Sequence, residues 1–302
     1  MIVTERYEQL PQSPRVIVLG NFDGVHLGHQ ALVQASVQLR DRMGGSVVVM
    51  SFHPHPLQVL GYPVELITPE EQKLRLFEAM GVDAYFRMPF DRATASMLPG
   101  QFVDQVLRQQ IDAQAVVVGF NFSFGRGGVG TPEFLANTLA AYQIPVTIVP
   151  PVLSDGEAVS STRVRQLIKQ GDLQRVAALL GRPYSIGGRV VRGDQRGRRI
   201  GFPTANLGDL QQLVLPPFGV YAAEVIGLGY GMANLGTRPS FPQAGPSLEV
   251  HIFDGCGDLY GRYLEVRLLE FIREEWQFAG ADELRQQLER DEQRIRTLLD
   301  LP

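Results

Sequence analysis

The 302-residue sequence has almost no cysteine, no long apolar run and no excess of positive charge. Its single cysteine, Cys256, cannot form an internal disulfide and argues against a site built from several thiolates. No apolar stretch approaches the length needed to span a bilayer, and the start of the chain lacks a basic segment followed by an apolar core, so we expect a cytoplasmic protein. The formal net charge of −4 predicts neither nucleic acid nor a membrane as a partner, so any anionic ligand must be held by a local site.

Hydrophobic residues make up 44% of the chain and charged residues 20%, which is typical of a globular protein, and the length suits two domains. In the first half, apolar runs alternate with helical patterns, which predicts a parallel sheet of strands at 16–19, 46–52, 83–86, 115–118 and 145–149. After Arg182-Pro183 the pattern becomes short strands with Gly and Pro turns, at 185–192, 220–226, 231–235, 248–253 and 264–269. We therefore predict an α/β chain with domains at 1–182 and 183–302, the second barrel-like and covered by a terminal helix.

The run from Gly20 to His29 sets two histidines three residues apart where a strand turns into a helix. From Leu27 onward the apolar residues recur at helical spacing, so His26 and His29 open the helix and lie one turn apart. Unpaired N–H groups and the positive end of the helix dipole favour an anion there, and glycines let a ligand approach closely. The segment predicts a nucleotide-phosphate site.

Two other interpretations of His26 and His29 stay open. One is that His26 is a helix cap and His29 a surface residue. The other is a zinc site, although the spacing is shorter than in His-Glu-x-x-His, no Glu follows His26, and Cys256 is far away in sequence.

Three further polar segments follow predicted strands and are expected at the same edge of the sheet. The first is residues 52–56, where prolines hold His53 and His55, and the second is the Gly-rich run 119–128 with Arg126. The third is residues 159–165, which open a helix with cations in its first turn, where the dipole disfavours them unless an anion compensates. Each segment also has an interpretation without a ligand. Residues 52–56 could be a proline-ordered surface loop, the Gly-rich run could be a mobile connection, and Arg165 could have a structural role.

In the second half, residues 197–206 are too polar for a strand, so we expect a loop there. Thr204 and Asn206 supply hard oxygen ligands that could help to hold magnesium carried by a nucleotide, although turn-forming residues would look the same. Glu249 lies in an alternating run and shares a face with His251. It is either a base or a carboxylate that points to water.

With these segments in view, nearly the whole chain resembles the bacterial bifunctional riboflavin kinase/FAD synthetase family. Gly20 to His29 resembles its nucleotidyltransferase motif, residues 52–56 its Pro-His-Pro segment, residues 119–125 its Asn-Phe loop and residues 160–165 its Ser-Ser-Thr-x-x-Arg element. Residues 201–206 resemble the Pro-Thr-Ala-Asn motif of riboflavin kinases. Residues 215–221, 234–239 and 259–261 also fit, as does Glu249.

The resemblance implies a Rossmann-like nucleotidyltransferase domain with a parallel sheet, followed by an antiparallel β-barrel kinase domain. The kinase would convert riboflavin and ATP to FMN, and the first domain would transfer AMP from ATP to FMN, giving FAD and pyrophosphate. The implied catalytic residues are His26, His29 and Glu249. The implied nucleotide-binding residues of the first domain are Gly20, Phe22, Asp23, Gly24, His55, Asn121, Ser160, Thr162 and Arg165. The implied ATP- and flavin-binding residues of the kinase are Gly201, Pro203, Thr204 and Asn206, with Mg²⁺ held by Thr204 and Asn206.

The sequence departs from the family pattern at two positions. Many relatives carry Asp where Asn121 stands, and a lysine is usual where this chain has Gln277. Two other functions compete with the bifunctional enzyme: a single-activity nucleotidyltransferase with a flavin-binding β domain, and a catalytically silent flavin-binding protein. Both are disfavoured by the phosphate-handling residues present in the two halves.

Overall fold

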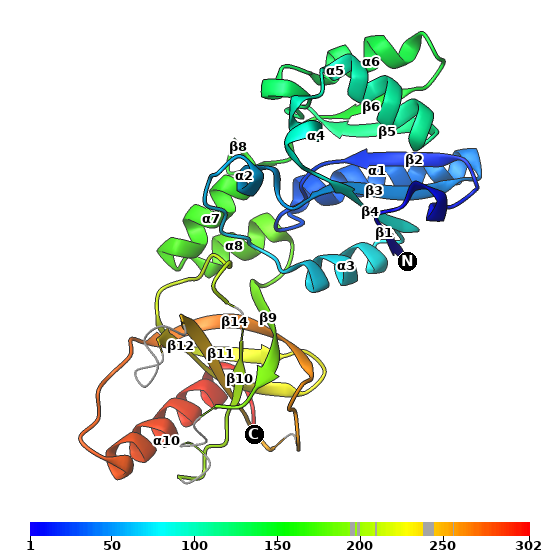
Figure 1. The fold of residues 1–302 in the computed structure, drawn as a ribbon. Helices are drawn as coiled ribbons and strands as arrows, with labels where there is room; N and C mark the ends of the chain where they lie inside the picture. The colour runs from blue at the N-terminus through cyan, green and yellow to red at the C-terminus, as the bar shows by residue number, and fades with distance from the viewer. Residues whose placement is uncertain (194–196, 198–199, 209, 238–244, 256) are drawn as a thin grey trace. The chain divides into compact units, whose positions relative to one another are not determined.

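The computed structural model describes residues 1–193, 197, 200–208, 210–237, 245–255 and 257–302, which divide into two compact units (Figure 1). Unit 1 comprises Met1–Val64 and Lys73–Ser161, and unit 2 comprises Glu65–Gln72 and Thr162–Pro302. Two pairs of residues in the motifs singled out above, Arg198-Arg199 and Arg238-Pro239, lie outside the described residues. Each unit is described by itself.

Unit 1 is built on a six-stranded parallel sheet with the strand order β1-β4-β3-β2-β5-β6. The strands are β1 (Ile2–Thr4), β2 (Arg15–Leu19), β3 (Ser46–His53), β4 (Ala84–Pro89), β5 (Ala113–Gly119) and β6 (Val146–Val149). The five predicted strands are confirmed. Strand β1 was not predicted, because three residues are too few to show a periodic pattern.

Helices cover both faces of this sheet (Figure 1). In β2, Val16 and Val18 pack into one core with α1 (Leu27–Met43) and α3 (Glu70–Ala79), while Ile17 and Leu19 pack into a second core with the π-helix η2 (Phe102–Gln110) and α6 (Pro132–Ala140). Successive side chains of a strand point to opposite faces, so a continuous apolar run requires two covering layers. The α/β layering expected from the alternating pattern is confirmed.

Shorter elements complete unit 1. They are η1 (Tyr7–Gln9), α2 (Pro56–Val59), α4 (Arg92–Ser96), α5 (Pro99–Gln101), η3 (Arg126–Gly128), β7 (Leu153–Ser154) and β8 (Glu157–Ala158). Helix α6 begins at a Thr-Pro pair, with Thr131 Oγ1 accepting a hydrogen bond from Phe134 N at 3.1 Å and Pro132 at the first helical position.

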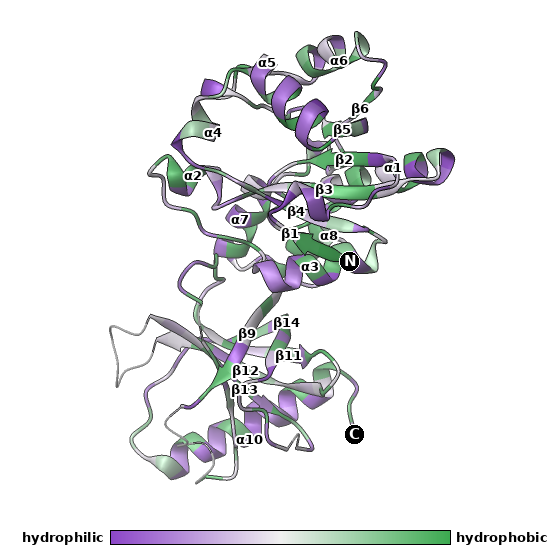
Figure 2. Cartoon of the chain, turned by 45° about the vertical axis from the view of Figure 1, so that its right-hand side comes forward, coloured by the Kyte–Doolittle hydropathy of each residue, from purple (hydrophilic) through white to green (hydrophobic). Residues whose placement is uncertain are grey.

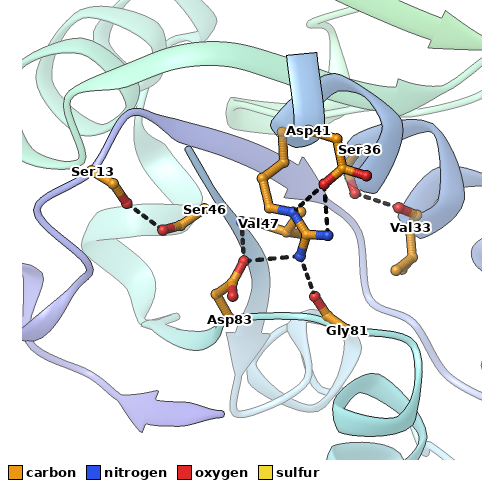
Figure 3. Close-up of polar contacts among 9 residues, drawn as sticks. Ser13, Val33, Ser36, Asp41, Ser46, Val47, Gly81 and Asp83 are labelled. Carbon is orange, nitrogen blue, oxygen red and sulfur yellow. Dashed lines mark hydrogen bonds and ion pairs between the residues drawn. The ribbon is translucent and has the colours of Figure 1, made fainter. Parts of the chain in front are cut away.

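Hydrogen bonds close the amino-terminal edge of the sheet, as Figure 3 shows. The carboxylate of Asp83 accepts a hydrogen bond from Val47 N at 2.8 Å, and the guanidinium of Arg40 at the end of α1 donates to Gly81 O at 2.8 Å. The Ser13 and Ser46 hydroxyls also bond to each other. These contacts are structural, and they lie at the end of β3 opposite to the one where the polar segments follow the strands.

Unit 2 contains a closed antiparallel barrel with the strand order β10-β13-β12-β11-β14-β9. The strands are β9 (Ser185–Val191), β10 (Ala205–Leu207), β11 (Gly219–Val225), β12 (Gly229–Thr237), β13 (Pro246–Ile252) and β14 (Tyr263–Arg273). The expectation that residues 197–206 form only a loop is wrong at its end, because Ala205 and Asn206 belong to β10. Strand β10 pairs with both β9 and β13, so the ladder that closes the barrel outweighs the polar composition.

Helix α10 (Ala281–Leu298) packs against the barrel, and both hydrophilic and hydrophobic residues occur along it (Figure 2). Ile295 is fully buried, whereas Leu298, three residues later, is 48% exposed. The buried Asp291 accepts hydrogen bonds from Arg273 of β14 at 2.9 Å and from Gln287 at 2.8 Å. A buried ion pair therefore ties the helix to the barrel.

Unit 2 also includes a segment from the first half of the chain, Glu65–Gln72, and the helices α7 (Ser161–Gln170) and α8 (Leu173–Leu180). Leu66 N donates to Gln212 O at 2.7 Å, and Val214 N donates to Leu66 O at 2.9 Å. The buried Gln72 amide donates to Ser185 Oγ and to Glu265 Oε1. The compact units thus differ in extent from the ranges 1–182 and 183–302, which stay a prediction about the two catalytic modules.

Removing the carboxylate in Asp291→Ala should lower the free energy of unfolding of the barrel by about 3–5 kcal/mol, because it leaves the buried Arg273 guanidinium uncompensated. Urea unfolding followed by the fluorescence of Trp276, the only tryptophan in the sequence, measures this unit. The matched control on the same helix is Glu289→Ala, which breaks an exposed pair with Arg285 and should cost no more than about 0.5 kcal/mol. Equal effects of the two substitutions would contradict the prediction.

Candidate functional site

The turn between β2 and α1 has an unusual backbone. Phe22 (φ 53°), Gly24 (φ 88°) and Val25 (φ 41°) all have positive φ, which costs free energy for bulky and β-branched residues. Phe22 and Val25 are buried in the core beneath α1, and this burial holds the turn in place. The turn directs the start of α1 and its two histidines to the carboxyl edge of the sheet.

His26 is the N-cap of α1, as the capping interpretation predicts, and its Nδ1 accepts a hydrogen bond from His29 N at 3.4 Å. Because Nδ1 accepts, the neutral His26 ring carries its proton on Nε2. The two imidazoles stack with a centroid distance of 3.7 Å and an interplanar angle of 18°, and Phe22 packs edge-on against His29 at 5.2 Å. His26 can therefore cap the helix while its ring and that of His29 face the same side.

Burial lowers the pKa of His29 well below its usual value, and the nearby His26 and Lys73 lower it further. Its Nδ1 is buried and has no hydrogen-bond partner among the residues that the structure describes. At neutral pH the ring is therefore uncharged, and it can offer an N–H to a phosphate oxygen rather than a permanent positive charge. The proximity of Lys73 to His29 cannot be predicted from the sequence, because no local pattern links residues 44 positions apart.

Three predicted site residues follow three neighbouring strands. His26 comes after β2, His55 after β3 and Asn121 after β5, and these strands are adjacent in the order β3-β2-β5. Carboxyl ends of parallel strands meet at one edge, so the expected convergence of these segments at that edge is confirmed. His55 caps α2, with its Nδ1 accepting from Leu57 N at 3.2 Å, and Asn121 is exposed.

The segment before α7 lies against the same turn. Ser161 Oγ donates to Asp23 O at 2.8 Å. Gly28 lies close to Val159, since a Cβ added to Gly28 would lie 3.7 Å from Val159 O. Ser160, between these two contacts, therefore lies close to the turn that carries the histidines. Thr162 and Arg165 belong to unit 2, where Arg165 Nε donates to Glu65 O at 2.8 Å, and their assignment to the nucleotide stays a prediction.

Two other predicted elements have structural roles in unit 1. The Phe22 side chain is fully buried, so it supports His29 and could meet a nucleotide only through its backbone. The Gly-rich run, for which a mobile connection is one alternative, is anchored: Phe124 is buried and exchanges two backbone hydrogen bonds with Gly130, and Arg126 N donates to Met97 O at 2.7 Å. The rest of the run is largely exposed, including Phe120 and Asn121.

A second polar cluster lies on the barrel. Thr204 Oγ1 donates to Glu249 Oε2 at 3.3 Å. Asn206 of β10 and Asn234 of β12 both lie directly opposite Glu249 of β13, one on each side. Residues directly opposite each other in an antiparallel ladder share a face, so the two amides flank the carboxylate. The fold thus brings Glu249 to the predicted Thr204 and Asn206, which lie more than 40 residues before it in sequence.

The donors of this cluster fit a magnesium ion bound with a nucleotide. Asn206 is only 6% exposed, and its amide lies against Gly193, where a Cβ would come within 2.6 Å of Asn206 Cγ. Hydroxyl and amide oxygens are hard ligands, and Mg²⁺ usually takes few protein ligands and completes its shell with phosphates and water. In the described part of the chain, no group of three or more His, Cys, Asp or Glu side chains could hold a metal.

Two family models match the two halves of the chain, one for each of the two clusters. The family model for FAD synthetase matches residues 8–163, and the model for riboflavin kinase matches residues 180–299. A bifunctional riboflavin kinase/FMN adenylyltransferase from Bacillus subtilis is 40% identical over 291 residues, covering 93% of this chain and 92% of its own. One from Escherichia coli K12 is 40% identical over 300 residues, covering 97% and 95%.

A solved structure extends the similarity to the whole fold. A crystal structure described as a macrolide-efflux protein from Streptococcus pneumoniae superposes with a TM-score of 0.84, at 33% identity and with 98% of both chains covered. Among the residues described for the present chain, none of the helices has the length and apolar character needed to cross a membrane.

His29 should stay neutral at pH values where a free histidine, with a pKa of about 6.5, is half protonated. The reason is desolvation of the ring together with the nearby His26 and Lys73, which lower its pKa. Binding of ATP should raise the pKa, because phosphate charge stabilises the imidazolium. A pH titration of ¹³C-labelled histidines by NMR measures both effects, with His29→Gln to assign the resonance. A midpoint at or above 6.5 without nucleotide would refute this.

Proposed function

The chain belongs to the family of bifunctional riboflavin kinases/FMN adenylyltransferases, and from that premise we propose how its residues carry out two successive reactions. In the kinase module, assigned to residues 183–302, ATP phosphorylates riboflavin to FMN. In the adenylyltransferase module, assigned to residues 1–182, a second ATP transfers AMP to FMN, giving FAD and pyrophosphate. ATP is the co-substrate of both steps.

In the adenylyltransferase module, a phosphate oxygen of FMN attacks the α-phosphorus of ATP and pyrophosphate leaves. The attacking group is already ionised, so positioning and stabilisation of charge are sufficient for catalysis. We assign this stabilisation to N–H groups of His26 and His29 and to the start of α1, which face the same side. The nucleotide would be held by Gly20, Phe22 (through its backbone), Asp23, Gly24, His55, Asn121, Ser160, Thr162 and Arg165.

In the kinase module, Glu249 accepts the proton of the ribityl hydroxyl as its oxygen attacks the γ-phosphorus and ADP leaves. Thr204 and Asn206 would hold the Mg²⁺ of ATP, which neutralises phosphate charge when bound. Thr204 Oγ1 lies within hydrogen-bond distance of the Glu249 carboxylate, so the proposed base and the proposed nucleotide ligand share one small site. Gly201 and Pro203 precede these ligands and would shape the ATP and flavin contacts.

The observation that carries the proposal is that each unit has its own cluster suited to phosphate chemistry. A single-activity nucleotidyltransferase with a flavin-binding barrel would not require a carboxylate flanked by Thr204, Asn206 and Asn234. We further propose that the enzyme acts in the cytoplasm on riboflavin, FMN and ATP, without nucleic acid or membrane partners.

Substitutions should separate the two reactions. His29→Ala should reduce FAD formation from FMN at least about 100-fold and leave FMN formation unchanged, because it removes a phosphate donor from one module only. Glu249→Gln and Asn206→Ala should do the reverse with riboflavin as substrate, Glu249→Gln by about 100-fold or more through the loss of a base. Product separation after incubation of riboflavin or FMN with ATP and magnesium measures both.

In this design each variant serves as the control for the other site. Loss of both reactions in any one variant would contradict the assignment of separate sites. An intact kinase step in Asn206→Ala would refute the magnesium ligand. Wild-type protein that makes neither product would refute the proposed function as a whole.

A further inference from the structure

Two side chains of β13 contact the segment just before it enters β10. Thr204 Oγ1 donates to Glu249 Oε2 at 3.3 Å, and His251 Nδ1 lies 2.8 Å from Pro203 O. Glu249 and His251 are two residues apart on one strand and therefore share a face. The first contact joins two side chains that substrates would engage, whereas the second joins an imidazole to a backbone carbonyl.

The contact of His251 is well defined chemically. A carbonyl oxygen only accepts, so Nδ1 must carry the proton and donate it to Pro203 O. The imidazole also packs against Phe202 with a centroid distance of 5.0 Å, and the Phe202 side chain is buried in the core beneath α10. The ring of His251 is thus fixed by packing while its N–H holds the neighbouring backbone.

The bond acts directly on the peptide plane that leads into Thr204. Pro203 O and Thr204 N belong to the same planar unit, so fixing the oxygen restricts where Thr204 begins. The chain enters β10 at Ala205, where the ladders with β9 and β13 fix Asn206. The chain is therefore fixed on both sides of Thr204, by the bond from His251 to Pro203 O before it and by the ladders of β10 after it.

We propose that His251 is a positioning residue of the kinase reaction: through its bond to Pro203 O it holds Thr204 in place for the phosphates of ATP. His251 itself need not contact substrate. The inference rests on the proposed kinase function, and it concerns the binding of nucleotide rather than the chemical step. Loss of the bond should weaken ATP binding more than it slows turnover.

The test compares substitutions that keep or remove the N–H. His251→Phe retains a ring beside Phe202 and removes the donor. His251→Asn restores a donor, because its amide nitrogen lies about as far from the backbone as Nδ1 does. His251→Leu is a second variant without the donor, for use if the His251→Phe protein does not fold. For each, kcat and the KM for ATP are measured with riboflavin, and binding of ADP with Mg²⁺ is measured by calorimetry.

We expect the donor-free variants to raise both the KM for ATP and the dissociation constant of ADP about three- to tenfold, which corresponds to the net loss of one hydrogen bond. The kcat should change less than twofold, and His251→Asn should restore most of the affinity. Hydrogen exchange in residues 201–206 should be faster in the donor-free variants. FAD formation from FMN, at the other site, should be unchanged.

Three outcomes would overturn the inference. They are unchanged nucleotide affinity in both donor-free variants, equal losses in His251→Asn and His251→Phe, and a fall in kcat at constant KM. The failure of the proposed function is distinguishable, because it would appear as wild-type protein that forms no FMN, whereas ADP binding and hydrogen exchange report on His251 without turnover.

Discussion

The start of helix α1 sets the chemistry of the first unit. A helix leaves its first N–H groups without partners inside the helix, and here an imidazole, rather than a hydroxyl or carboxylate, satisfies one of them. The capping imidazole of His26 stacks with a second imidazole, that of His29, one turn later in the helix. The strained turn before the helix is held by buried side chains, so the geometry of the pair is built in before any ligand arrives.

In the second unit, strand register plays the part that the helix start plays in the first. The residues Asn206, Glu249 and Asn234 come from three strands and lie side by side because the ladders of the closed barrel leave no freedom to slip. A shift of one residue in any of these strands would move its side chain to the opposite face. The carboxylate proposed as the base is thus positioned by the fold as a whole.

Much of this arrangement is predictable from the sequence, where the signal is local. The buried run of β2 and the helical spacing after Leu27 predict β2 and α1 correctly. Strand β10 was missed because its existence depends on partners distant in sequence. The influence of Lys73 on His29 was missed for the same reason: burial and charge at a site are properties of the packed molecule.

The segment Glu65–Gln72 lies between the two chain segments of unit 1, yet it forms hydrogen bonds with residues of unit 2, among them those of the buried Gln72 with Ser185 and Glu265. Unit 2 is consequently discontinuous along the polypeptide. A gene fragment that starts at the beginning of the barrel would encode a protein with an exposed seam where this segment normally packs. No single cleavage of the backbone could release either unit whole.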